Sequence, residues 1–138
     1  MSGFLLDTNV VSELIRKKPE PSVFTWVDSI NEELLYLSVL TFGEIRKGIA
    51  RLPLDARRTK LEVWLEVELT EWLGDRILPI DRAISERWGR LAGDSRSPLP
   101  IVDGLLAATA LHYDLTLVTR NVRDLQRTNV PLFNPWQA

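Results

Sequence analysis

The sequence predicts an α/β domain in which a mainly parallel sheet is covered by helices on both faces. Short apolar runs bounded by turn-forming residues alternate along the chain with segments whose apolar residues recur at helical spacing. This alternation is typical of crossover units, which lay successive strands parallel to one another. The chain has 138 residues, 45% of them hydrophobic, which suits one core. We therefore expect residues 1–138 to form a single domain.

The predicted strands are short and apolar. FLLD, residues 4–7, is the first, and the helix after it has Asn9 or Ser12 as its candidate N-cap. LLYLSVLT, residues 34–41, is rich in large apolar and β-branched residues and predicts the second strand. Further strands are expected at residues 76–80, at 116–121 and within 130–136.

Helical spacing and cap residues predict the helices between these strands. Pro21 and Ser22 begin one of them, and Asp55 is the expected N-cap of a long helix that reaches Leu73. The segment SPLP, residues 97–100, breaks the chain before the last long helix. The helices are expected at about residues 21–30, 42–52, 55–73, 82–92 and 102–113.

Composition excludes several classes of function. The absence of cysteine excludes disulfides, thiolate catalysis and zinc–thiolate sites. The apolar runs are too short to span a bilayer and the N-terminus lacks the pattern of a signal peptide, so we expect a cytoplasmic protein without a membrane partner. The net charge of −2 gives no overall field that would attract nucleic acid.

Acidic residues follow the predicted strands. Asp7 ends the first strand, and Glu44 is expected in the first turn of the helix after the second. Asp103 is expected in the first turn of the helix after SPLP, and Asn121 and Asp124 follow the fourth strand. In an open parallel sheet the carboxyl ends of the strands form one ligand-binding edge. We therefore expect these side chains to lie near one another.

Each acidic residue alone has an ordinary explanation: Asp7 as a turn or cap residue, and Glu44 and Asp103 as first-turn residues that complement the helix dipole. Several carboxylates brought together repel one another, however, unless a cation offsets their charge. Oxygen ligands without cysteine or paired histidines favour Mg²⁺ or Mn²⁺, which can activate water for phosphodiester hydrolysis. Metal-bound water would be oriented by Thr8, Asn9 and Thr119. Room for a metal, water or phosphate would be left by Gly43 and Gly104, and flanking phosphates would be bound by Arg46 and Arg120.

Four segments resemble the PIN-domain ribonucleases, and most of all the VapC toxins of type II toxin–antitoxin pairs in their FitB-like branch. The segments are FLLDTNVVSEL, LSVLTFGEIRKGI, PIVDGLLAATAL and LVTRNVRDL with the later FNPW. The resemblance implies a PIN-like three-layer α/β/α fold with four or five mainly parallel strands. It also implies a metal-dependent endoribonuclease that cleaves transfer or ribosomal RNA and so inhibits translation and growth.

The resemblance assigns roles to individual positions. Asp7, Glu44 and Asp103 match the acidic metal ligands, and Thr119 matches a hydroxyl that lines the site. Many members have aspartate where this chain has Asn121. Asn121 then holds a metal-bound water while Asp124 supplies the last charge, or three carboxylates hold a single metal. We expect Asp124 to take part.

The resemblance also implies partners. A cognate VapB- or FitA-like antitoxin would bind the toxin and, through its own DNA-binding segment, the promoter. A homodimer is expected, with a heterotetramer or larger assembly in the complex. Val63 and Val67 lie away from the main apolar stripe of the 55–73 helix, where they either widen the core contact or form a surface for antitoxin or a second copy.

A rival interpretation is a catalytically idle PIN domain that acts as an RNA- or antitoxin-binding module. Asn121 in place of an acidic residue keeps this alternative open. Aspartyl-phosphate enzymes are disfavoured because position 9 is asparagine and no lysine follows a late strand. His112, near a predicted helix end, is not expected to be catalytic.

Overall fold

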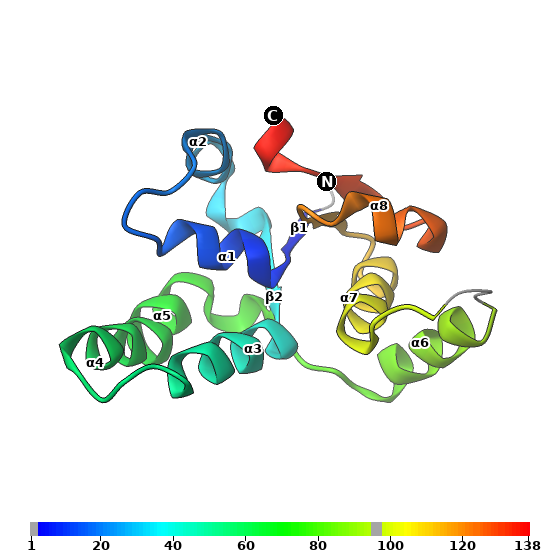
Figure 1. Ribbon diagram of the computed structural model, residues 1–138. Coiled ribbons are helices and arrows are strands. Elements are labelled where there is room, and N and C mark those ends of the chain that lie inside the picture. The colour runs from blue at the N-terminus through cyan, green and yellow to red at the C-terminus, as the bar shows by residue number, and fades with distance from the viewer. Residues whose placement is uncertain (1–2, 95–97) are drawn as a thin grey trace.

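A parallel sheet lies between two layers of helices (Figure 1). The computed structural model describes residues 3–94 and 98–138. Within them the strand order is β3-β2-β1-β4-β5, and all four strand pairs are parallel. The three-layer α/β/α fold expected from the sequence is therefore confirmed. The strands are β1 Phe4–Leu6, β2 Leu35–Ser38, β3 Ile77–Leu78, β4 Thr116–Val118 and β5 Leu132–Phe133.

The order of the strands places a topological switch point between β1 and β4. From β1 the chain proceeds outward through β2 and β3, and it then returns to the other side of β1 to form β4 and β5. Helices that follow β1 and β4 consequently leave the sheet toward opposite faces. A crevice forms at such a point, beyond the carboxyl ends of the two central strands.

The central strands bury apolar side chains on both faces, as a sheet covered on both sides requires. On β1, Leu6 packs into the core cluster formed with the helices between β1 and β3, whereas Leu5 packs into the cluster formed with the helices on either side of β4 in the chain. Neighbouring β4 repeats this division, with Val118 in the first cluster and Leu117 in the second. Alternation of the side chains along each strand thus builds the two cores.

The helices begin and end close to the positions that the sequence predicts. Asp55 caps its helix as expected, because its carboxylate accepts a hydrogen bond from the backbone N–H of Arg58 at 3.1 Å. The helix through Leu73 is wound as a π-helix over Trp64–Leu69. The helices are α1 Thr8–Leu14, α2 Pro21–Ser29, α3 Val39–Ala50, α4 Ala56–Val63, α5 Thr70–Leu73, α6 Arg82–Asp94, α7 Ile101–His112 and α8 Val122–Leu125.

Three expectations about local structure are wrong. Asp7, and neither Asn9 nor Ser12, is the N-cap of α1, since its carboxylate accepts from the backbone N–H of Thr8. The second strand ends at Ser38, whose hydroxyl oxygen accepts from Leu40 N and starts α3 three residues before the expected end of the strand. Glu44 consequently lies in the second turn of α3 and not in the first.

Other expectations concern surface and loop residues. Val63 and Val67 are 49% and 46% exposed, so the expectation that they widen the core contact is wrong, and the interaction-surface reading stays a prediction. The SPLP segment precedes α7 as expected, with Pro100 at the N-cap position, while Ser97 lies outside the described residues.

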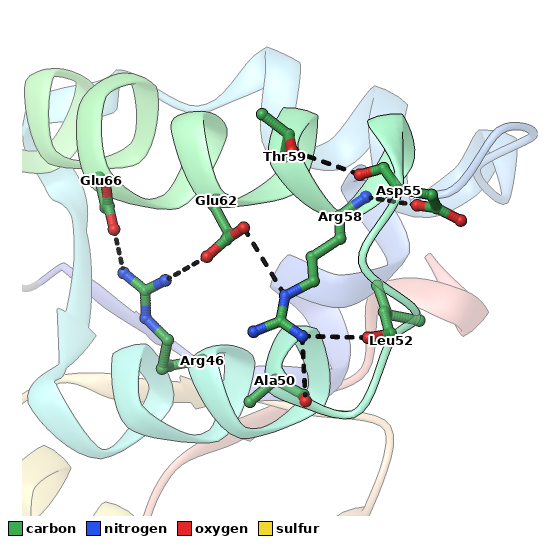
Figure 2. Close-up of polar contacts among 8 residues, drawn as sticks. All are labelled: Arg46, Ala50, Leu52, Asp55, Arg58, Thr59, Glu62 and Glu66. Carbon is green, nitrogen blue, oxygen red and sulfur yellow. Dashed lines mark hydrogen bonds and ion pairs between the residues drawn. The ribbon is translucent and has the colours of Figure 1, made fainter.

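Two arginines tie α3 to the helix that follows it (Figure 2). The guanidinium of Arg58 donates to the carbonyl oxygens of Leu52 at 3.1 Å and Ala50 at 3.5 Å, and so satisfies acceptors at the C-terminal end of α3. Arg46, which lies on α3, forms ion pairs with Glu66 and Glu62. These contacts fix α3, and with it Glu44, relative to α4.

Gly104 allows α6 to lie directly against α7. A methyl group at Gly104 would meet two atoms of the Trp88 ring at 2.9 Å, whereas nothing lies within 4 Å of the corresponding position at Gly43. The expectation that Gly104 leaves room for a metal or phosphate is therefore wrong: the indole of Trp88 fills this space. Gly43 does leave open space.

Replacement of Gly104 by alanine should destabilise the protein, because overpacking against a rigid ring costs about 1–3 kcal/mol. The matched control is Gly89→Ala on α6, where nothing lies within 4 Å of the new methyl group. That change should leave stability equal or raise it by up to about 1 kcal/mol, the difference in helix propensity. Urea unfolding measures both; equal stabilities for the two variants would contradict the close Trp88 contact.

Candidate active site

Asp7 lies at the switch point and is held on both carboxylate oxygens. Its backbone N–H donates to the carbonyl oxygen of Val118 at 2.9 Å, which extends the pairing of β1 with β4 to this residue. Oδ1 accepts from Thr8 N at 2.6 Å, and Oδ2 accepts from the hydroxyl of Thr119 at 2.8 Å and from the amide of Asn9 at 3.4 Å. The side chain of Asp7 is buried, at 6% exposure.

Glu44 approaches the same region from α3. The hydroxyl of Thr8 donates to Glu44 Oε1 at 2.5 Å, so the residue that follows Asp7 orients the second carboxylate. Glu44 itself is half-buried. The bond joins α1 to α3, which begin at neighbouring strands of the sheet.

Asp103 enters from the other side of the crevice, in the first turn of α7 as expected. Its Oδ2 accepts from the side-chain amide of Asn121 at 3.1 Å. The backbone N–H of Asn121 in turn donates to Thr119 Oγ1 at 3.0 Å. Thr119 thus contacts both Asp7 and the residue that orients Asp103.

These side chains line one open pocket of ≈ 560 Å³ at the carboxyl edge of the sheet. The structure therefore brings together most of the residues expected from the sequence, with Pro100, Ile101 and Val102 completing the wall. The predicted site residues in the lining are Asp7, Thr8, Asn9, Glu44, Asp103 and Asn121. Thr119 lies directly behind Asp7 and is fully buried.

The pocket raises the pKa of two of its carboxyl groups. Burial raises the pKa of Asp7, and the charges of Asp103 and Glu44 raise it further, against the lowering effect of the hydrogen bonds from Thr119 and Thr8. Burial also raises the pKa of Asp103, as do the charges of Asp124 and Glu44, while the bond from Asn121 lowers it. The carboxylates are therefore close enough to repel one another.

Asp124 contributes charge without lining the pocket. It lies exposed on the short helix α8, which the sequence did not predict, and its charge acts on Asp103. Asp124 therefore acts on the site through its charge and not as part of the pocket wall. Its part in catalysis stays a prediction.

The donor set fits a hard divalent cation. The pocket offers carboxylate and amide oxygens, which such ions prefer, and a cation would offset both the burial of these charges and their mutual repulsion. In the described ranges 3–94 and 98–138, however, no three acidic or histidine side chains form a ready-made coordination group. Thr8 and Asn121 hold Glu44 and Asp103 in hydrogen bonds within the protein. Asp7, Glu44 and Asp103 are the residues that would hold the ion.

The two arginines expected near the pocket differ in their surroundings. Arg46 forms ion pairs with Glu66 at 2.6 Å and Glu62 at 3.7 Å (Figure 2), so its charge is offset within the protein. Arg120 is exposed, and its guanidinium carbon lies 5.1 Å from the ring centre of Trp136. Sequence reasoning missed this contact, although the quoted FNPW segment contains the aromatic partner.

Known proteins share the sequence pattern and the fold of this chain. The sequence pattern of the PIN domain matches residues 4–130. This chain belongs to the PIN-domain family. It is similar to VapC ribonuclease Y4jK of Sinorhizobium fredii, with 35% identity over 96% of this chain and 97% of the relative.

Two further comparisons agree. Toxin FitB of Neisseria gonorrhoeae is 35% identical over 96% of this chain and 97% of its own. A solved structure of FitAB bound to an IR36 DNA fragment superposes on this PIN domain with a TM-score of 0.90 at 34% identity, and covers 96% of this chain and 95% of that one. The resemblance expected from the four sequence segments is thus confirmed. No helix in the described part of this chain is long and apolar enough to cross a membrane.

Replacement of Asp103 by asparagine should stabilise the metal-free protein at high pH. A carboxyl group with a raised pKa in the folded state costs stability once it ionises, so the gain should be present at pH 8 and absent below about pH 4, the ordinary carboxyl pKa. Loss of the carboxylate charge should therefore raise the Tm at pH 8 and leave it unchanged near pH 3.5.

Thermal unfolding in a chelator at pH 8 and near pH 3.5 measures this difference. Asp75→Asn, an exposed position outside the pocket lining, is the matched control for the loss of one charge. A lower Tm for Asp103→Asn than for the control at pH 8 would contradict mutual repulsion at the site.

Proposed function

We propose that this PIN domain is the toxin of a type II toxin–antitoxin system and an endoribonuclease that hydrolyses RNA phosphodiester bonds. The observation that carries the proposal is the convergence of Asp7, Glu44 and Asp103 on one pocket, from segments up to 96 residues apart in the chain numbering (103 − 7). The relatives named as a VapC ribonuclease and as a FitB toxin support it. Cleavage of transfer or ribosomal RNA, the expected target, would inhibit translation and growth.

The residues of this chain would divide the work as follows. Asp7, Glu44 and Asp103 would hold Mg²⁺ or Mn²⁺, which when bound would supply activated water and neutralise charge on the phosphate. Thr119 and Thr8 fix the direction of the Asp7 carboxylate by donating to its two oxygens. Asn121 fixes Asp103 in the same way, and Asp124 adds negative charge at the rim. Such orientation of ligands by neighbouring hydrogen bonds strengthens metal binding.

The proposal includes the expected partners and setting. The cognate partner is a VapB- or FitA-like antitoxin, through which the complex would contact promoter DNA. The solved structure of FitAB bound to an IR36 DNA fragment supports a toxin–antitoxin complex that binds DNA. The toxin acts as a homodimer in the cytoplasm and forms a heterotetramer or larger assembly with antitoxin. Residues 1–138 are taken as one domain, which the family match over residues 4–130 supports.

A second function has its own support. A catalytically idle PIN domain would bind RNA or antitoxin without cutting, and two observations favour it: Asn121 stands where an acidic residue is expected, and the described carboxylates form no ready-made metal group. The burial of Asp7 with two fixed oxygens favours the enzyme, because perturbed carboxylates of this kind cluster at catalytic sites.

Asp7→Asn should abolish cleavage while it leaves the fold intact. Loss of residues that merely orient metal ligands costs about ten- to a hundredfold in activity, so loss of a ligand should cost at least about a hundredfold. The measurement is the sequencing of RNA 5′ ends after brief expression, together with growth. Asp75→Asn is the control and should behave as the unsubstituted protein does. Identical 5′ end profiles for Asp7→Asn and the unsubstituted chain would contradict the nuclease function and favour the binding module.

Mg²⁺ or Mn²⁺ should raise the thermal stability of the purified chain. A ligand that binds the folded state at about a hundred times its Kd adds about 2.7 kcal/mol. Asp7→Asn should lose most of this gain, whereas Asp75→Asn should keep it. Calorimetry measures the Tm of each protein with each ion and with EDTA. A wild-type Tm that does not change when either ion is added would count against the metal site.

A further inference from the structure

Arg120 is fixed by its backbone at the rim of the acidic pocket. It follows Thr119, which is fully buried and donates to Asp7, and it precedes Asn121, which lines the pocket. Its own backbone N–H donates to Oδ1 of Asn9, another lining residue, at 3.3 Å. The position of Arg120 is therefore set by the same contacts that set the site.

The side chain of Arg120 rests on an aromatic platform. Its guanidinium carbon lies 5.1 Å from the ring centre of Trp136, within the range of a cation–π contact. Trp136 is held in turn, because its backbone N–H donates to Asn134 Oδ1 at 2.9 Å and its carbonyl accepts from Ser22 on α2 at 3.5 Å. Trp136, like Trp26 and Phe133, also packs against the core cluster that contains Leu6 and Val118.

The charge of Arg120 is not offset within the described part of the protein. No carboxylate lies within ion-pair distance of it there, in contrast to Arg46, which two glutamates engage. A guanidinium that stacks on a ring keeps its N–H donors at its edge, where they can bind a phosphate in bidentate fashion. The cation is thus both oriented and free to bind an anion.

A polyanion meets repulsion at a pocket lined by three carboxylates. A fixed cation at the rim would lower this repulsion at one point and would set the position of the strand. Phosphate contacts of this kind determine where a nucleic acid lies and carry no sequence information.

We propose that Arg120, held against Trp136, binds a phosphate of the RNA strand beside the pocket. Trp136 is then a positioning residue that acts through Arg120. The proposal rests on the ribonuclease function proposed above. It makes the C-terminal FNPW segment part of the RNA-binding surface, and it assigns the phosphate contact to Arg120 in preference to Arg46.

The test compares Arg120→Gln and Trp136→Leu with Arg123→Gln, an exposed arginine on α8 outside the pocket lining. KM and kcat are measured on an RNA that the wild type cleaves, at several salt concentrations. Arg120→Gln should raise KM about tenfold with kcat within about twofold, as expected for one charge-assisted contact. The salt slope of log(kcat/KM) should fall by about 0.7, the value for one phosphate on a single strand. Arg123→Gln should change neither.

Trp136→Leu alone should raise KM by about threefold. In a chain that already carries Arg120→Gln it should raise KM no further, because the effects of residues that act through one another are not additive. Trp136→Phe, which keeps an aromatic face, should restore the wild-type KM. Equal effects of Arg120→Gln and Arg123→Gln, or an additive double variant, would overturn the proposal. Thermal melts identify a variant that fails to fold, and the phenylalanine variant then decides the role of the ring.

A failure of the proposed nuclease function can be distinguished from a failure of the phosphate contact proposed for Arg120. If the wild type cleaves no RNA, anisotropy of a labelled single-stranded RNA with the chain in EDTA decides the inference. Weaker binding by Arg120→Gln than by Arg123→Gln would support the phosphate contact, and equal binding would overturn it.

Discussion

The hydrogen bond from Thr119 to Asp7 joins two residues 112 positions apart, and the geometry of the site depends on it. Thr119 is fully buried and also accepts from the backbone of Asn121, whose amide holds Asp103. One hydroxyl therefore orients a carboxylate on each side of the crevice. Because Asp7 is removed from solvent, these hydrogen bonds replace the water that would otherwise surround its charge. The parallel pairing of β1 with β4 makes the contact possible.

The burial of these carboxylates also reduces the stability of the folded protein. The pKa values of Asp7 and Asp103 are raised by burial and further by the neighbouring negative charges, and ionised groups with raised pKa values reduce the stability of the folded chain at neutral pH. Proteins retain such arrangements where function requires them. The two arginines have different surroundings: Arg120 on Trp136 leaves its charge available, whereas the ion pairs of Arg46 fix α3.

The fold could be predicted from the sequence because strand–helix alternation is visible in the pattern of apolar residues, and Asp7 and Asp103 could be placed because they directly follow predicted element boundaries. Other features depend on tertiary contacts. Val39, Leu40 and Thr41 have strand-like character, yet the hydroxyl of Ser38 starts a helix there and moves Glu44 by a turn. The partner of Gly104 is a ring on another helix, and the glutamates that engage Arg46 lie 16 and 20 residues away (62 − 46 and 66 − 46). No local pattern encodes these distances.

The position of β4 late in the chain has a consequence for synthesis. A nascent polypeptide that has emerged only through α7 already contains Asp7, Glu44 and Asp103, but it lacks Thr119 and Asn121. Asp7 then has no partner across the central strand pair and stays hydrated. The arrangement of carboxylates at the pocket is therefore assembled only after β4 and Asn121 have been synthesised, and a chain that has emerged only through α7 has an incomplete pocket.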